Sequence, residues 1–235
     1  MTDQTPLKSE LLRLNKYLAL CLAISRREAD NLIDRGAVAI NGKIATLGAR
    51  FSTNDKITVD NKPLPKKAEY EYIALYKPTG YVCSRKQQGD NPTIYQLLPS
   101  KLHHLKPVGR LDCNSSGLIL LTNDGDFAYR MTHPKFYKTK IYQVELDDEL
   151  APLHQQMISD FGINLEDGSS KLQLEKINEM DRKKWIVTMH EGRNRQIRRT
   201  FSALGYTVRK LHRTDFGSYN IGDLQSGKFE VIKNA

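Results

Sequence analysis

One stretch of this chain, residues 108–125, combines a glycine-bounded loop with a run of apolar residues. Residues 118–121 are Leu-Ile-Leu-Leu, and a short apolar run beside glycine is typical of a strand buried within a sheet. The loop before this run holds a single carboxylate, Asp112, two residues after Arg110. An arginine at that spacing can keep an acid ionised and oriented. The stretch therefore predicts a buried strand whose entry loop presents one aspartate.

Two further carboxylates, Asp124 and Asp126, follow the same apolar run. A strand of about 5 residues is roughly 17 Å long, so it separates them from Asp112. We interpret them as turn and N-cap residues of a helix over about 126–131. No Asp-x-Asp pair or histidine cluster indicates a metal site.

Length and composition limit the classes that the chain can belong to. Its 235 residues are enough for one large domain or two smaller ones, and no apolar run of about 18 residues predicts a membrane span. Residues 1–6 do not resemble a signal peptide, and three widely spaced cysteines suggest reduced thiols in the cytoplasm. Cys113, beside Asp112, is a weak alternative nucleophile because no paired base is visible in the sequence.

The net charge of +9 is concentrated at the two ends of the chain. Residues 1–67 carry 12 Lys or Arg against 7 Asp or Glu, and residues 190–235 carry 9 against 4, so each end has a net charge of +5. The segment between them carries 15 against 16. This distribution favours a polyanion contacted at two places. Lysines that only confer solubility are the alternative, but the C-terminal charge is mostly arginine, which is favoured for phosphate contacts.

The basic N-terminal segment predicts two helices followed by a small sheet. Apolar residues recur at a helical period from Arg13, and Ser25 with Glu28 forms a capping box for a helix over about 26–35. Asn41-Gly42 is a strong hairpin turn signal. The helices carry Arg13, Lys16, Arg26, Arg27 and Arg35. Arginines at a helix start oppose the helix dipole, which favours RNA contact over simple solvation.

These motifs together resemble a known family. Gly109-Arg110-Leu111-Asp112 resembles the motif of the pseudouridine synthases, in which the aspartate is the catalytic nucleophile. The continuation through Ser-Ser-Gly-Leu and Leu-Thr-Asn-Asp-Gly is similar to the branch that modifies ribosomal RNA. Residues 25–42 resemble the RNA-binding domain of ribosomal protein S-four, over about 11–65. Lys77-Pro78 matches the first family motif, whose lysine has a supporting role.

The resemblance implies roles for two further segments. Lys140-Ile-Tyr142 lies on a strand predicted over 138–144. The resemblance implies that this tyrosine stacks on the target uracil and relays a proton; a structural, half-buried tyrosine is the alternative. In Arg195-Gln-Ile-Arg198-Arg199, the resemblance pairs Arg198 with the nucleophilic Asp112 and places Ile197 against the uracil. We assign catalytic roles to Asp112, Arg110, Tyr142 and Arg198, and substrate contacts to Ile197, Lys140, Arg195, Arg199, Arg13, Lys16, Arg26 and Arg27. Arg209, Lys210 and Arg213 are expected to extend the basic surface.

The predicted fold is α+β. An S-four-type RNA-binding domain over 11–65 and a linker over 66–69 precede a catalytic domain over 70–235, which is built on a mainly antiparallel mixed sheet flanked by helices. The predicted function is isomerisation of one uridine of ribosomal RNA to pseudouridine, in the large subunit in preference to the small. The expected protein is a cytoplasmic monomer that needs no cofactor, metal or membrane. A non-catalytic RNA-binding or ribosome-assembly protein and an Asp-dependent hydrolase are the alternatives.

Overall fold

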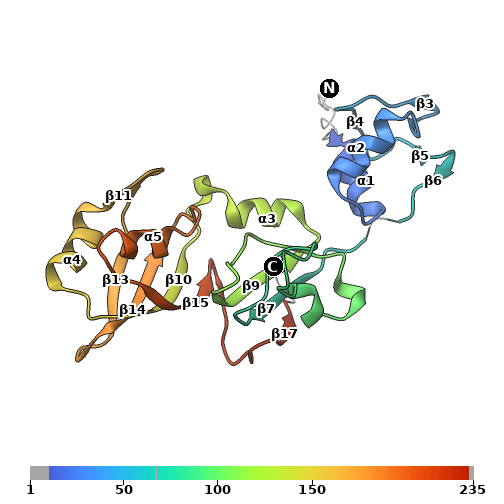
Figure 1. The fold of residues 1–235 in the computed structure, drawn as a ribbon. Coiled ribbons are helices and arrows are strands. Elements are labelled where there is room, and N and C mark those ends of the chain that lie inside the picture. The colour runs from blue at the N-terminus through green and yellow to red at the C-terminus, as the bar shows by residue number, and fades with distance from the viewer. Residues whose placement is uncertain (1–10, 67, 233–235) are drawn as a thin grey trace, which may run out of the picture. The chain divides into compact units, whose positions relative to one another are not determined.

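The computed structural model describes residues 11–66 and 68–232, and the chain divides into two compact units, Met1–Tyr70 and Glu71–Ala235 (Figure 1). Three parts of the sequence predictions lie outside the described residues. They are the N-terminal stretch 1–6, Lys67 of the predicted linker, and residues 233–235 of the predicted second domain.

The first unit begins with two packed helices, α1 (Leu14–Cys21) and α2 (Arg26–Asp34). The predicted capping box is confirmed, because the Glu28 amide donates to Ser25 Oγ at 3.1 Å and the Ser25 amide donates to the Glu28 carboxylate at 2.6 Å. Leu14 and Leu18 of α1 pack with Ala29 of α2 in one buried cluster. Periodic apolar residues thus give this unit its own core.

Short strands complete the first unit. A four-stranded sheet has the order β3 (Lys43–Ile44), β2 (Val38–Ile40), β5 (Ile57–Val59) and β6 (Lys62–Pro63). The predicted turn joins β2 and β3, and Asn41 and Gly42 have φ of 51° and 80°, as a type I′ hairpin requires.

Two expectations for this unit need correction. Arg13 does not lie in the first helix: it ends β1 (Leu12–Arg13), which pairs with β4 (Arg50–Phe51), because its extended backbone is that of an N-cap residue. Pro63 and Pro65 indicate a stiff, proline-containing segment leading into the linker, but Pro63 is paired in β6 with Thr58. A proline fits there because an edge position does not require its missing amide hydrogen.

The second unit is built on a nine-stranded sheet. Its main path is β13-β14-β10-β15-β9-β7-β17, while β16 pairs with β15 and β8 with β9. The pair β15–β9 is parallel and the other pairs are antiparallel, so the predicted mixed, mainly antiparallel sheet is confirmed. The strands are β7 (Tyr72–Lys77), β8 (Lys106–Pro107), β9 (Ser116–Thr122), β10 (Lys140–Leu146), β13 (Gln173–Asn178), β14 (Asp181–Met189), β15 (Val208–Phe216), β16 (Tyr219–Asn220) and β17 (Phe229–Val231).

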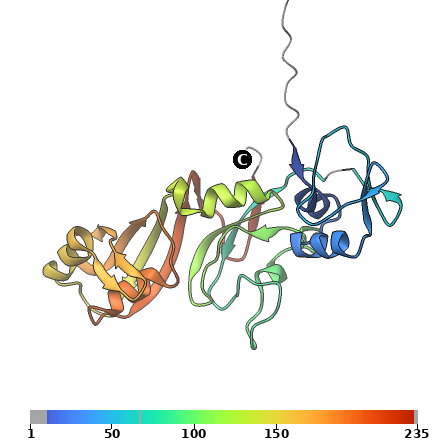
Figure 2. The ribbon, with the colours of Figure 1, turned by 90° about the horizontal axis from the view of Figure 1, so that it is seen from above.

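Every residue of β9 is buried, as its apolar run predicts. Leu118 and Leu120 pack on one face against α3 (Gly125–Thr132), which lies along the sheet in Figure 2. Ile119 and Leu121 pack on the other face, in the cluster that includes α5 (Gln196–Ser202). A strand covered on both faces loses the usual polar alternation. Asp124 caps α3 through its Oδ1, which confirms its predicted N-cap role.

The remaining elements are short. They are α4 (Pro152–Gln156), a π-helical turn (Met157–Phe161), the hairpin β11 (Ile163–Leu165) and β12 (Gly168–Ser170), and 3₁₀ turns at Ile94–Leu97, Ser100–Leu102 and Pro134–Phe136. Lys138, which we expected inside a strand, precedes β10. Within residues 11–66 and 68–232, no helix has the length and apolar character needed to cross a membrane.

Candidate active site

The loop that carries Asp112 is held in place by a buried lysine at the end of β7. Lys77 is fully buried, and its Nζ donates to the carbonyls of Ser115 at 2.6 Å, Pro78 at 2.9 Å and Cys113 at 3.4 Å. Burial lowers the pKa of Lys77, while the nearby Cys83, Cys113 and Asp112 oppose that shift. These contacts fasten the segment directly after Asp112 to the end of β7 and make Lys77 a positioning residue.

Replacing Lys77 with methionine is expected to loosen this loop. Methionine fills a similar volume but removes the ammonium donor from the carbonyls of Ser115, Pro78 and Cys113, of which only Cys113 keeps another donor among the described residues, the Gly80 amide. We therefore expect the free energy of unfolding to fall by about 1–3 kcal/mol. At temperatures where the variant is folded, we expect about a tenfold or larger loss of turnover with little change in RNA affinity, because the carboxylate is displaced. Urea unfolding and single-turnover kinetics measure the two effects. Lys101→Met is the exposed control, and an equal effect there contradicts the assignment.

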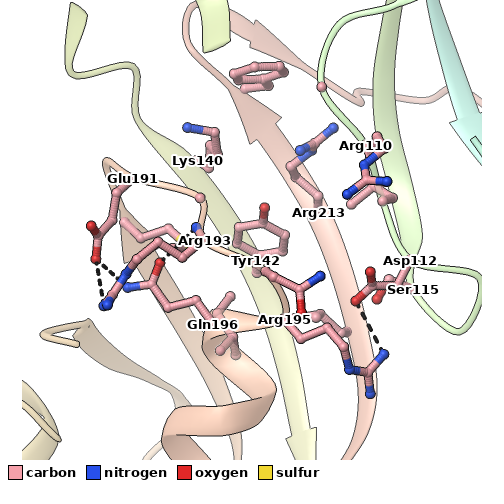
Figure 3. Close-up of a pocket in the computed structure, with 18 of the residues that line it drawn as sticks. Arg110, Asp112, Ser115, Lys140, Tyr142, Glu191, Arg193, Arg195, Gln196 and Arg213 are labelled. Atoms are coloured by element: carbon pink, nitrogen blue, oxygen red, sulfur yellow. Dashed lines mark hydrogen bonds and ion pairs between the residues drawn. The ribbon is translucent and has the colours of Figure 1, made fainter. Parts of the chain in front are cut away.

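Asp112 forms its ion pair with Arg195, at the start of α5. Arg195 Nη1 lies 3.5 Å from Asp112 Oδ2, and both side chains are partly exposed (Figure 3). We expected Arg198 in this place, and the structure corrects that contact. Arg198 instead donates to the carbonyls of Val208 at 2.7 Å and Asn114 at 2.8 Å, and to Ser115 Oγ at 3.3 Å. It therefore supports the backbone of the loop that holds Asp112.

The two arginines are expected to give different signatures when they are replaced. Arg198→Gln removes charged hydrogen bonds to main-chain carbonyls, so we expect a loss of about 1.5–3 kcal/mol in the free energy of unfolding together with slower turnover. Arg195→Gln removes a half-exposed ion pair, which contributes at most about 1 kcal/mol to stability. It should therefore slow turnover about tenfold while urea unfolding is nearly unchanged. If Arg195→Gln destabilised the protein and Arg198→Gln slowed turnover without destabilising it, Arg198 would be the partner of Asp112 instead.

Two other predicted arginines occupy unexpected surroundings. Arg110 is exposed and lines the cavity, yet it makes no hydrogen bond or ion pair with Asp112 or with any other described residue. The segment 110–112 is irregular, so the spacing of two residues does not aim their side chains at each other. Arg199 is held by Asp167, whose carboxylate it contacts at 3.0 and 2.7 Å. Its predicted contact with substrate competes with that pair.

Asp112 opens into a cavity of about 580 Å³. Tyr142 of β10, Ile197 of α5 and Leu211 of β15 are buried in its wall. Strand alternation places Tyr142 and Lys140 on the same face of β10, as predicted. In Figure 3 the Tyr142 ring lies between the segment that carries Asp112 and the loop before α5. This part of the cavity thus combines the Asp112 carboxylate with an aromatic and aliphatic wall.

Another part of the cavity wall is positively charged, and the contribution of Arg213 to it was not predicted from the sequence. Lys140 and Arg213 are buried there, although we expected Arg213 on the surface. The correction follows from strand alternation, which sends Arg213 to the same face as Leu211. Burial, followed by the positive charge of Arg213, lowers the pKa of Lys140 to about 8, whereas Glu191 opposes that shift.

A polar network borders the cavity at the loop between β14 and α5. Glu191 accepts hydrogen bonds from Arg193, at 3.3 Å, and from the side-chain amide of Gln196. Arg193 also contacts the Asp167 carboxylate at 2.9 Å. The Arg-x-x-Gln spacing is the signal that could have indicated this network, because it turns one arginine and the glutamine toward the same preceding residue.

The remaining predicted contact residues lie in the first unit. Arg13, Arg26 and Arg27 are exposed, and Lys16 is half-buried.

Near Asp112, the Cys113 thiol donates to Asn91 Oδ1 at 3.4 Å, and the structure shows no base paired with it among the described residues. In the same part of the chain, no group of three or more His, Cys, Asp or Glu side chains could hold a metal ion.

Comparisons with known proteins agree on one family. A model of the RNA pseudouridylate synthase family matches residues 71–203, and an S4 domain model matches residues 12–57. The chain is 36% identical to the ribosomal large subunit pseudouridine synthase B of Bacillus subtilis, over 92% of this chain and 89% of that one. It is 37% identical to the ribosomal small subunit pseudouridine synthase A of Pasteurella multocida, over 94% and 96%. A crystal structure of a pseudouridylate synthase superposes with a TM-score of 0.66 at 34% identity, covering 94% of this chain and 96% of that one.

Proposed function

Because the chain belongs to the RNA pseudouridylate synthase family, we propose that it isomerises one uridine of ribosomal RNA to pseudouridine with Asp112 as the catalytic carboxylate. The observation that carries the proposal is the placement of Asp112. Its carboxylate lies beside Arg195 at a cavity walled by Tyr142 and Ile197. A cavity of about 580 Å³ is in the size range of sites that enclose a small molecule, which includes a nucleoside turned out of its stack.

The reaction rearranges one nucleoside without adding or removing atoms. The N1–C1′ bond breaks, the uracil rotates while it stays in the site, and a C5–C1′ bond forms. The proton on C5 is lost and N1 gains one, so the net change is an isomerisation. The site must therefore supply a carboxylate and an enclosure that retains the detached base.

The residues on the cavity wall match those needs. Asp112 is assigned the carboxylate role, which is attack on C1′, attack on the base, or removal of the 2′ proton. Arg195 provides the adjacent positive charge that pairs with this carboxylate. We assign the stacking surface to Tyr142 and the opposite apolar border to Ile197, both of which line the cavity. Arg198 holds the loop of Asp112 through hydrogen bonds to the Asn114 carbonyl and to Ser115 Oγ.

The first unit, over about 11–65, is proposed to anchor the RNA. Turning a uridine out of its stack costs a few kcal/mol, which favours loops and loosely paired sites. Phosphate contacts from Arg13, Lys16, Arg26 and Arg27 offset that cost without reading sequence. We propose large-subunit ribosomal RNA as the substrate. Small-subunit RNA is the alternative, because relatives named for each subunit match the chain to similar degrees.

Mapping pseudouridine in both ribosomal RNAs tests this proposal. Unmodified small- and large-subunit RNAs are incubated separately with the protein, and pseudouridine is located at nucleotide resolution. We expect one new site, in the large-subunit RNA. A single site in the small-subunit RNA keeps the reaction and changes the substrate. No site in either RNA, despite tight binding, would favour the RNA-binding or ribosome-assembly alternative.

A further inference from the structure

Arg213 of β15 is a buried cation with an unused donor. Its side chain is 2% exposed, and its Nε donates to the Leu118 carbonyl at 2.8 Å. Its Nη2 is buried and has no hydrogen-bond partner among the described residues. A buried guanidinium nitrogen without an acceptor is costly, so an arginine held in this way is prepared for an anion. Its side chain lines the cavity that Asp112 enters.

Lys140 of β10 adds a second cation to the same wall. The Lys140 ammonium lies 5.2 Å from the centre of the Phe216 ring, and the Arg213 guanidinium lies 4.8 Å from it. Both cations therefore lie near the same aromatic ring. Figure 3 shows Lys140 and Arg213 in the upper part of the site. Lys140 donates one hydrogen bond to the described residues, to the Lys138 carbonyl at 3.2 Å. Two like charges held this close repel each other unless an anion neutralises them.

Among the described residues, no carboxylate forms an ion pair with Lys140 or Arg213. Two carboxylates line the cavity, and both are occupied elsewhere. Asp112 is paired with Arg195. Glu191 accepts from Arg193 and Gln196, so it offers Lys140 only a longer-range attraction.

We infer that Lys140 and Arg213 form a phosphate subsite that receives a phosphate of the target nucleotide. This inference rests on the proposed function, and it deepens that function by naming the substrate group bound at the wall away from Asp112. The guanidinium Nη2 and the ammonium donate to the phosphate oxygens, and such charge-assisted bonds are the strongest that a polar site offers. The subsite holds the nucleotide by its backbone, so the sugar and base are aligned with Asp112 and Tyr142 while the base rotates.

Binding of uridine monophosphates to the intact protein tests the subsite without turnover. Uridine 5′-monophosphate, uridine 3′-monophosphate and uridine are titrated separately, and the Lys140 ammonium is followed by NMR on protein with ¹³C-labelled lysine, its signal assigned with Lys140→Arg. An anion beside Lys140 favours its charged form, so a bound monophosphate should raise the pKa of Lys140 and uridine should not. The monophosphate that binds more tightly shows whether the 5′ or the 3′ phosphate occupies the subsite.

Variants separate the subsite from general attraction to a basic protein. Arg213→Gln is expected to weaken monophosphate binding about tenfold, and Arg213→Lys is expected to weaken it less because the charge is kept. The exposed control Lys101→Gln should leave monophosphate binding unchanged. Equal binding by Arg213→Gln and Lys101→Gln, or an unchanged pKa of Lys140 with both monophosphates, overturns the inference. Since no product is measured, monophosphate binding with no pseudouridine in either ribosomal RNA would refute the proposed function alone. Pseudouridine formation without the binding effect would refute the subsite alone.

Discussion

Asp112→Asn is expected to abolish pseudouridine formation while the protein still folds and binds RNA. Asparagine has nearly the same shape as aspartate and can still accept a hydrogen bond from Arg195, but it is uncharged and neither attacks the nucleoside nor takes a proton. Loss of a catalytic residue of this kind lowers the rate by about 10⁴-fold or more. Single-turnover conversion of the mapped ribosomal RNA measures the rate, and a filter-binding titration measures RNA affinity.

Asp223→Asn is the matched control for this substitution. Asp223 is exposed in the same unit and does not line the cavity, so the same chemical change there should leave the rate unaltered. Asp112 is about one-third exposed, and we expect its replacement to change the free energy of unfolding by less than about 1 kcal/mol. An Asp112→Asn protein that turns over at the rate of the control would remove Asp112 from the mechanism. RNA binding unchanged with turnover lost separates a catalyst from a binding protein.

Local sequence signals predicted the parts of this fold that neighbouring residues determine. The capping box of Ser25 and Glu28 needs three residues of spacing, and the Asn41-Gly42 turn needs two residues that tolerate positive φ. The run 118–121 predicted a strand because no polar residue interrupts it, and the structure shows this strand buried on both faces. In each case the interaction is complete within one segment of the chain.

The site was harder to predict because segments far apart in the sequence build it. The pairing of Arg195 with Asp112 depends on the left-handed backbone of Arg195, with φ of 46°, at the start of α5. The family resemblance assigned this pairing to Arg198 instead. Strand alternation places Arg213 on the face of Leu211, but its burial there also depends on the pairing of β15 with β9, which the sequence of β15 does not indicate. The family resemblance therefore located the site, while the choice between adjacent arginines required the fold.

That pairing also explains the second large effect that we expect, a loss of folding in Gly117→Ala. Gly117 lies opposite Arg213 where the parallel strands β9 and β15 meet, and its φ is 113°. A Cβ at this position would lie 2.5 Å from the main-chain nitrogen of Arg213 and 2.8 Å from its carbonyl carbon, and it would also overlap the carbonyl oxygen. Main-chain atoms in the middle of a sheet cannot move aside as a flexible side chain can. The strands must separate, so we expect the free energy of unfolding to fall by about 4 kcal/mol or more.

Gly205→Ala distinguishes this steric clash from the cost of positive φ. Gly205 lies in the same unit with φ of 87°, and a Cβ there would meet no atom within 4 Å. Alanine in a left-handed conformation costs about 1–2 kcal/mol, and Gly205→Ala should show that cost alone in urea unfolding. Gly117→Ala should yield little folded protein, or protein that unfolds at much lower urea. Similar losses for the two variants would mean that β9 and β15 do not approach as closely as the structure shows. In that case Arg213 would not be held in the wall of the cavity, and the phosphate subsite would lose its support along with the strand pairing.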